Sequence, residues 1–186
     1  NRVVASRPYT IETLQQALTF ADQEHPDLHL TQPSLMNIMK QAGYKTFWVT
    51  NQQTLSGRNT MLTNFSQQTD EQVYLNHTRS QNSYSFDEAV LEPFARILQD
   101  PAERKFIVVH LLGTHMVYEY RYPSEFGVFK DKTGLPGWVT DSQLPLINHY
   151  DNAVRYNDHV VASLIERLDA RGDRSMMLYF SDHGED

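Results

Sequence analysis

Cysteine is absent from the 186 residues of this sequence. Its absence excludes a disulfide scaffold, a zinc site built on thiolates and a cysteine nucleophile. It leaves the redox compartment open, because a protein without thiols can reside in oxidising or reducing surroundings. Any metal ligand or nucleophile must therefore come from side chains that present oxygen or nitrogen.

Long apolar runs and an excess of basic residues are also missing. No stretch approaches the roughly 20 apolar residues that span a bilayer, and no signal peptide is visible. The formal net charge of -7 argues against a general nucleic-acid binder, because such proteins normally carry a basic face. Hydrophobic residues make up 40% of the sequence and charged residues 21%, which indicates one globular domain and not a disordered chain.

The hydrophobic pattern alternates between helix and strand. It predicts helices over residues 10–21, 34–42, 85–98 and 144–168, and strands over 45–50, 105–112 and 175–180. The spacing of Ser85 and Glu88 predicts a capping box at the start of the third helix. The last helix is expected to bury Tyr150, Val154, Val161, Ile165 and Leu168. Residues 51–84 and 113–143 carry little pattern and are expected to form long loops, the first with a short helix at most.

Polar residues follow each of the three predicted strands. Strands separated by helices predict an α/β fold with a parallel sheet, in which ligands bind at the carboxyl ends of the strands. These ends deliver Asn51, the run Gly113-Thr114-His115, and the run Ser181-Asp182-His183-Gly184-Glu185. The sequence therefore predicts a functional site at this edge of the sheet.

The pair Asp182-His183 is the sharpest feature of that edge. In a turn that follows a strand, adjacent side chains can converge on one ion, and a carboxylate and an imidazole are good zinc ligands. Gly184 permits the tight backbone turn that such a convergence needs. The alternative is a structural turn in which Asp182 accepts hydrogen bonds from backbone amides.

Thr10 stands where the first helix is expected to begin, just after Pro8 and Tyr9. It could be an ordinary N-cap residue, since threonine is common there. It could also be a nucleophile, because a helix N-terminus stabilises an alkoxide and an attached phosphoryl group. A threonine hydroxyl needs such activation, or a metal that lowers its pKa, before it reacts.

Two of the eight histidines belong to the second predicted strand and the turn after it. His115 follows the strand, where it could bind phosphate oxygens or protonate a leaving group. His110 lies within the strand and is interpreted as a packed core residue. Apart from these two and His183, the histidines share no ligand-like spacing.

Four segments carry a family resemblance: residues 6–12 (Ser-Arg-Pro-Tyr-Thr-Ile-Glu), 110–123, 150–158 and 180–185. Together, and in this order, they resemble the phosphoethanolamine transferases of Gram-negative inner membranes, a family of the alkaline phosphatase/sulfatase superfamily. The resemblance runs along nearly the whole chain. It is closest to the branch that modifies a heptose of the lipopolysaccharide core.

The resemblance implies a three-layer α/β/α sandwich with a mostly parallel central sheet, of which this chain is a portion. It implies that residues 1–186 are part of a periplasmic catalytic domain, and that a membrane domain before them and the rest of that domain lie outside the sequence. Thr10 falls at the family's nucleophile and joins Asp182 and His183 as a zinc ligand. His115 falls at a histidine that contacts the phosphoryl group, and Asn51 lies near positions that line the substrate pocket. Two further metal ligands would lie outside the chain, so the isolated chain is expected to bind zinc weakly and to have little activity.

The activity implied by the resemblance is transfer of phosphoethanolamine from phosphatidylethanolamine to the lipopolysaccharide core or lipid A, through a covalent adduct on Thr10. The site would face the periplasm at the inner membrane. One alternative is a sulfatase or phosphodiesterase of the same superfamily, although Thr10 replaces the arginine that the sulfatase motif would place after Ser6 and Pro8. Another is a non-catalytic interaction domain.

Overall fold

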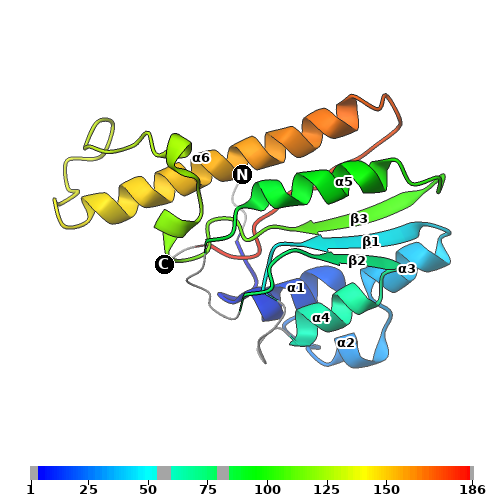
Figure 1. The fold of residues 1–186 in the computed structure, drawn as a ribbon. Coiled ribbons are helices and arrows are strands. Elements are labelled where there is room, and N and C mark those ends of the chain that lie inside the picture. Colours follow the sequence, from blue (N-terminus) through cyan, green and yellow to red (C-terminus); the bar gives the residue numbers. More distant parts are fainter. Residues whose placement is uncertain (1–3, 54–59, 79–83, 185–186) are drawn as a thin grey trace.

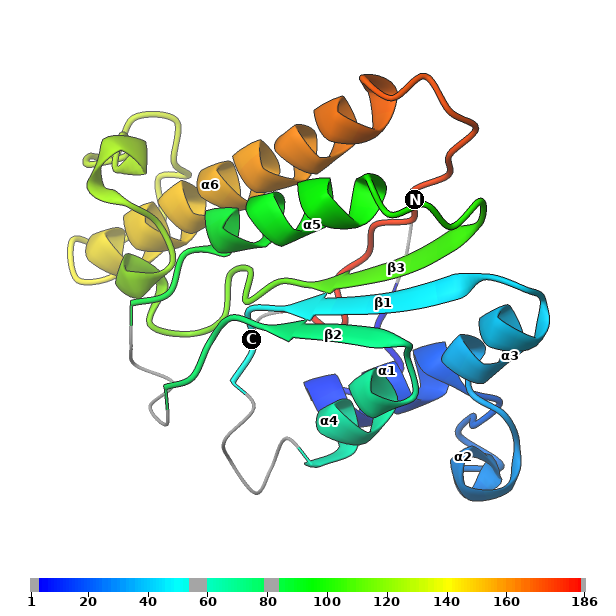
Figure 2. The same ribbon diagram turned by 45° about the vertical axis from the view of Figure 1, so that its right-hand side comes forward.

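The computed structural model describes residues 4–53, 60–78 and 84–184. At its centre is a parallel sheet of three strands in the order β2-β1-β3: β1 (Lys45–Thr50), β2 (Glu71–Tyr74) and β3 (Lys105–His110). Helices α1 (Thr10–Leu18), α2 (Leu28–Thr31), α3 (Leu35–Gln41) and α4 (Thr60–Gln67) lie on one side of it, and α5 (Leu91–Leu98) and α6 (Leu144–Asp169) lie on the other (Figures 1 and 2). The predicted three-layer α/β/α arrangement is confirmed for this portion of a sheet.

The middle strand β1 supplies both hydrophobic cores. Successive side chains of a strand point to opposite faces of the sheet, so Phe47 and Val49 pack with α5 and α6, while Trp48 packs with α1, α3 and α4. All three side chains are buried. Burying each contributes about 1.5–3 kcal/mol, which explains why a continuous apolar and β-branched run forms the centre of the sheet.

One strand of the sheet lies where the sequence predicts a loop. The strand β2 lies inside the predicted loop 51–84, pairs in parallel with β1 and has two exposed polar residues, Glu71 and Gln72. As an edge strand it lacks the apolar run that the sequence pattern requires. Residues 54–59 and 79–83 of that loop lie outside the described residues.

The predicted capping box at Ser85 and Glu88 is wrong. The chain instead enters a short 3-10 helix, η2 (Asp87–Val90), whose N-cap is Phe86 and has no side-chain cap bond. The Ser85 hydroxyl donates to Asn51 Oδ1 at 2.8 Å. A partner 34 residues away in sequence therefore takes the hydroxyl that a capping box would use locally.

The face that α6 buries also differs from the prediction. Its buried residues recur every four positions and include polar side chains: Asn148, Asn152, Ala153, Tyr156, Val160 and Leu164. Val154 and Ile165, both predicted to face inward, are 41% and 43% exposed. Asn152 is buried because it binds the loop 128–129 through its side-chain amide. Leu168 packs against the core as predicted, so ranking faces by hydrophobicity alone selects the buried stripe of this helix only in part.

The predicted strand at 175–180 is not formed in the structure. The segment returns from the end of α6 towards the sheet without entering a ladder (Figure 1). Met176 and Leu178 are 92% and 77% exposed. A strand needs a neighbour to pair its backbone groups, and composition does not show whether one is present.

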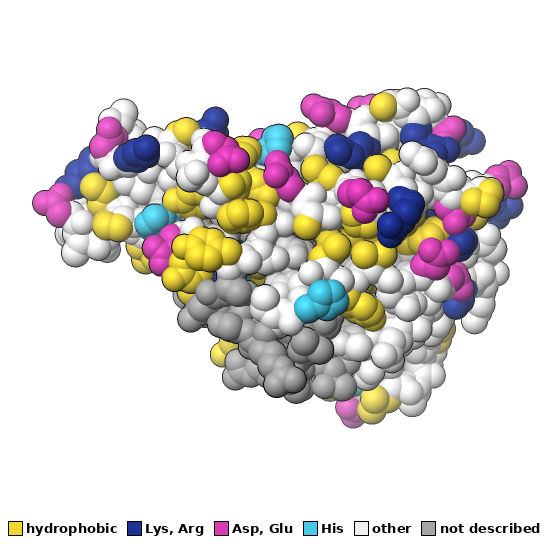
Figure 3. All heavy atoms as spheres, in the orientation of Figure 1, with side chains coloured by type: hydrophobic (Ala, Val, Ile, Leu, Met, Phe, Trp, Pro, Cys, Tyr) yellow, Lys and Arg dark blue, Asp and Glu magenta, His cyan; other side chains and the backbone are white. Residues whose placement is uncertain are grey.

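Surface charge is mixed on the face drawn in Figure 3, where Lys and Arg side chains alternate with Asp and Glu over α5 and α6. Among the described residues, no helix combines the length and apolar character required to cross a membrane.

Candidate active site at the carboxyl edge of the sheet

Thr10 and the pair Asp182-His183 meet in space although 173 residues separate Thr10 from His183. Thr10 is the first residue of α1, and its Oγ1 lies 3.4 Å from His183 Nε2. Asp182 Oδ2 lies 3.7 Å from the same nitrogen. The N-cap of α1 is Tyr9 and makes no side-chain cap bond, so Thr10 is not the capping residue of this helix.

The chemistry and spacing of these three groups fit part of a zinc site. Zinc bonds of about 2.0–2.1 Å in a tetrahedron separate the ligand atoms by roughly 3.3 Å, close to the 3.4 and 3.7 Å found here. His183 Nδ1 lies 2.8 Å from the Gly184 carbonyl oxygen. With the proton on Nδ1 donated to that carbonyl, Nε2 presents its lone pair towards Thr10 and Asp182.

Within the described residues, the side chains beside Thr10 do not make a full set of zinc ligands. Among the described residues, no group of three or more His, Cys, Asp or Glu side chains could hold a metal ion. Asp182 and His183 are two ligands of the usual kind, and the Thr10 hydroxyl is a third oxygen beside them. Structural and catalytic zinc sites use at least three protein ligands, so further donors are needed for tight binding.

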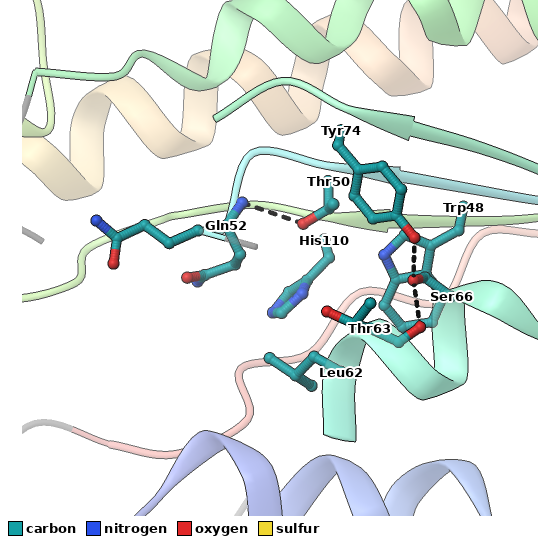
Figure 4. A pocket seen from close by; sticks show the side chains of 9 residues that line it. Trp48, Thr50, Gln52, Leu62, Thr63, Ser66, Tyr74 and His110 are labelled. Atoms are coloured by element: carbon teal, nitrogen blue, oxygen red, sulfur yellow. Dashed lines mark hydrogen bonds between the residues drawn. The ribbon is translucent and has the colours of Figure 1, made fainter. Parts of the chain in front are cut away.

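A small pocket lies between α4 and the carboxyl-terminal halves of the strands. Side chains of β1, β2, β3 and α4 line it, together with the two glutamines in the segment after β1. Figure 4 shows the side chains of Thr50, Gln52, Tyr74 and His110 around it. Ser66 Oγ and Tyr74 OH are hydrogen bonded at 2.6 Å along one wall. The pocket is lined by amide, hydroxyl and imidazole groups together with the Trp48 ring.

His110 packs as the sequence predicts. Its ring contacts the edge of Trp48 with 6.1 Å between ring centroids. Burial lowers the pKa of His110 to about 4, and the negative charge of Asp182 opposes this only in part. The imidazole is therefore neutral at pH 7.

His115 lies in the turn after β3, at the same edge of the sheet. Its backbone N–H donates to the Leu112 carbonyl at 3.3 Å, and its own carbonyl accepts from Arg121 Nε at 3.0 Å. Asn51 directly follows β1 and is only 1% exposed. Its side-chain amide donates to Asp87 Oδ1 and accepts from Ser85, so the structure places it among buried polar groups.

Two buried charged residues near the site were missed by sequence reasoning. Asp87 and Arg121 are 4% and 2% exposed. Asp87 lies within the predicted capping box, and Arg121 within the loop predicted over residues 113–143. Asp87 accepts from backbone N–H groups 25 and 26 residues away, and Arg121 donates to carbonyls in its own loop. Backbone partners of this kind leave no signal in the sequence.

The whole chain is similar in sequence to known proteins. A sequence model of the family described as Sulfatase matches residues 1–186. The chain belongs to the sulfatase family. Phosphoethanolamine transferase CptA from Salmonella typhimurium is 59% identical over 187 residues, a match that covers 100% of this chain and 32% of the relative. The chain thus spans about a third of the length of this curated relative.

Two solved structures agree with the fold. The C-terminal periplasmic domain of EptC from Escherichia coli, solved in complex with Zn, superposes with a TM-score of 0.86 and 60% identity over 92% of this chain and 48% of that one. An alkaline phosphatase superfamily protein from Vibrio parahaemolyticus gives a TM-score of 0.56 at 15% identity, covering 90% of this chain and 40% of that one. The second match shows a shared fold alone. The predicted alkaline phosphatase-like fold is confirmed.

Proposed function

We propose that the protein containing this chain transfers phosphoethanolamine from phosphatidylethanolamine to the lipopolysaccharide core heptose phosphate or to lipid A. The observation that carries the proposal is the approach of Thr10 Oγ1 to His183 Nε2, which in turn lies beside Asp182 Oδ2. The names of CptA and EptC support this transferase over a non-catalytic domain. Residues 1–186 would be part of a periplasmic catalytic domain held at the inner membrane by a domain outside this sequence, as the periplasmic EptC domain suggests.

Thr10, Asp182 and His183 would hold a zinc ion together with ligands from outside this chain, and the zinc complex of the EptC domain supports that assignment. A zinc ion bound there would lower the pKa of a hydroxyl and stabilise negative charge on phosphoryl oxygens. The backbone N–H groups at the start of α1 favour negative charge at the same point, because they and the helix dipole face it. Both effects would lower the free energy of the negative charge that develops on Thr10 Oγ1 and on the phosphoryl oxygens.

The reaction has two displacements at phosphorus. In the first, Thr10 Oγ1 bonds to the phosphorus of the donor, its proton passes to solvent, and the bond from phosphorus to the diacylglycerol oxygen breaks. That oxygen takes a proton from His115, and diacylglycerol leaves. In the second, an oxygen of the acceptor bonds to phosphorus as the bond to Thr10 Oγ1 breaks. Thr10 takes back a proton from solvent, and His115 regains one from the acceptor hydroxyl or from solvent. Such a covalent relay produces ping-pong kinetics.

The test is mass spectrometry of the full-length protein after incubation with phosphatidylethanolamine and no acceptor. We expect phosphoethanolamine on the peptide that contains Thr10, and none in Thr10→Ala. Thr19→Ala is the matched control, because Thr19 lies at the other end of the same helix, where its hydroxyl donates to the Gln15 carbonyl and accepts from the Ala21 N–H. An adduct on another residue, or none in the natural protein, contradicts the proposed function.

A second candidate is a hydrolase of the sulfatase family, which the family match itself favours. A hydrolase would release free sulfate, or a phosphate monoester from a diester, with water as acceptor. Assays of the full-length protein for these products, alongside transfer to lipopolysaccharide, distinguish the two reactions.

A further inference from the structure

The turn that carries His115 is bonded at its start to a buried carboxylate. Asp87, in η2, accepts hydrogen bonds from the backbone N–H of Leu112 at 2.9 Å and of Gly113 at 2.7 Å. It also accepts from Asn51 Nδ2 at 2.8 Å, and the Ser85 hydroxyl donates to Oδ1 of the same Asn51 amide. Hydrogen bonds to an ionised group are about twice as strong as neutral ones. Burial raises the pKa of Asp87, and these donors, together with the charge of Arg121, offset that rise only in part.

The same turn is bonded at its end to a buried guanidinium. Arg121 donates from Nε to the carbonyl of His115 at 3.0 Å and from NH2 to the carbonyl of Met116 at 3.2 Å. Burial lowers the pKa of Arg121, and the negative charge of Asp87 opposes that shift. The two charges therefore lie close enough to interact, and the turn is bonded to both of them.

The backbone between these contacts is strained. Gly113 and Val117 have φ values of +60° and +64°, and Val117 is the only residue other than glycine with positive φ among the described residues. A β-branched residue in this region is a genuine outlier, because its Cβ crowds the following carbonyl. Such strain persists where the surroundings over-determine the conformation, and it concentrates at functional sites.

We propose that Asp87 and Arg121 are positioning residues that fix the turn 112–117, and thereby aim His115 at the reacting phosphoryl group. This inference rests on the proposed function for the chemistry it serves. Stability alone is a poor explanation for the pair, because buried charges replaced by well-packed apolar groups often leave stability unchanged or improved. The contacts instead determine the shape of a turn whose backbone would not hold that shape unaided.

The first test is a double-mutant cycle between Asp87 and His115 in the full-length protein. Asp87→Asn keeps the size of the side chain but turns an acceptor into a donor facing backbone N–H groups. We expect it to slow formation of the Thr10 adduct about 10–100-fold in single-turnover experiments, the scale of a loss of alignment. In a His115→Ala background the same change should slow the reaction less than about 3-fold, because the group to be aimed is gone.

Asp70→Asn is the matched control. Asp70 also accepts a backbone N–H, that of Thr46 at 2.8 Å, but lies at the amino edge of the sheet. It should keep the natural adduct rate even where it lowers the melting temperature. If Asp87→Asn keeps the full rate, or slows both backgrounds equally, Asp87 has no positioning role. If Asp87→Asn does not fold, Arg121→Lys provides the second variant, because an ammonium cannot reproduce a planar fork on two carbonyls.

A crystal structure of the Asp87→Asn catalytic domain separates this inference from the proposed function. We expect the turn 112–117 to shift and Val117 to leave the left-handed region. An unchanged turn overturns the positioning role whatever reaction the enzyme catalyses. Absence of an adduct in the natural protein contradicts the proposed function alone.

Discussion

At the scale of single residues, the structure joins side chains that are remote in sequence. Thr10 Oγ1 and His183 Nε2 lie 3.4 Å apart and would carry the proposed chemistry. Asn51 belongs to the buried set around Asp87. Distances that join remote residues therefore decide the roles of side chains that look alike in sequence.

Zinc content provides the first prediction at this scale. In the full-length protein, Asp182→Ala and His183→Ala should each lose stoichiometric zinc, because each removes one of the few ligands and leaves too few for tight binding. Elemental analysis after dialysis measures the loss. His159→Ala is the control, since His159 bonds to Glu88 on the surface. Full zinc in either ligand variant would exclude that residue from the metal site.

The second prediction at the residue scale concerns the strained backbone of Val117. Val117→Gly should raise the free energy of unfolding of the catalytic domain by about 0.5–1 kcal/mol, because relief of left-handed strain exceeds the extra entropy that glycine loses on folding. Chemical denaturation measures the change. Val128→Gly should act in the opposite direction, because Val128 is exposed and does not have positive φ. A loss of stability in both variants would mean that the Val117 backbone is not strained.

At the scale of elements, α6 is the best test of which face is buried. Val160 is fully buried against β1 and α5. Val160→Ala should lower the free energy of unfolding by about 2 kcal/mol, through lost burial of two methyl groups and a residual cavity. Val154→Ala on the same helix should change it by less than about 0.5 kcal/mol, because Val154 is largely exposed. Equal losses would indicate that the face predicted from hydrophobicity is buried after all.

The sequence predicts the elements that are apolar and long, and misses those defined by partners. The strands 45–50 and 105–110 and the helices at 10, 34 and 144 follow from periodicity. The strand β2 was missed because an edge strand needs few apolar residues, and 175–180 was predicted as a strand because apolar composition does not report pairing. Asp182 and His183 stood out because metal-ligating types are recognisable singly. Asp87 did not, because backbone N–H groups 25 and 26 residues away define its role.

At the scale of the whole molecule, the two edges of the sheet carry different kinds of residues. The carboxyl edge carries the candidate active site, with buried charges and strained backbone. The amino edge carries exposed ion pairs, in which Lys45 contacts Asp100 at 2.7 Å and Glu71 at 2.6 Å, and Lys40 contacts Asp70 at 2.8 Å. The Asp100 and Glu71 contacts raise the pKa of Lys45 to about 12.

Acid stability should therefore depend on the amino edge. The hydrogen bond from Lys40, assisted by those from Thr46, lowers the pKa of Asp70 from 3.8 to about 2. A carboxyl group whose pKa is lower in the folded state stabilises the protein above pH 3.8, and this contribution disappears as the pH falls through about 2. In Asp70→Asn the free energy of unfolding of the catalytic domain should be lower at pH 6 and should fall less steeply between those two pH values.

Denaturation curves across this pH range measure the effect, with Asp173→Asn as control, because Asp173 pairs with Arg171 on an exposed turn near the end of α6. Identical slopes for the natural protein and Asp70→Asn would mean that Asp70 is not titrating in this window. Because Asp70 and Asp87 lie at opposite edges of one sheet, the first should alter acid stability and leave the adduct rate unchanged, whereas the second should alter the rate at constant pH. That division follows from a parallel sheet, in which every strand begins at one edge and delivers its functional residues at the other.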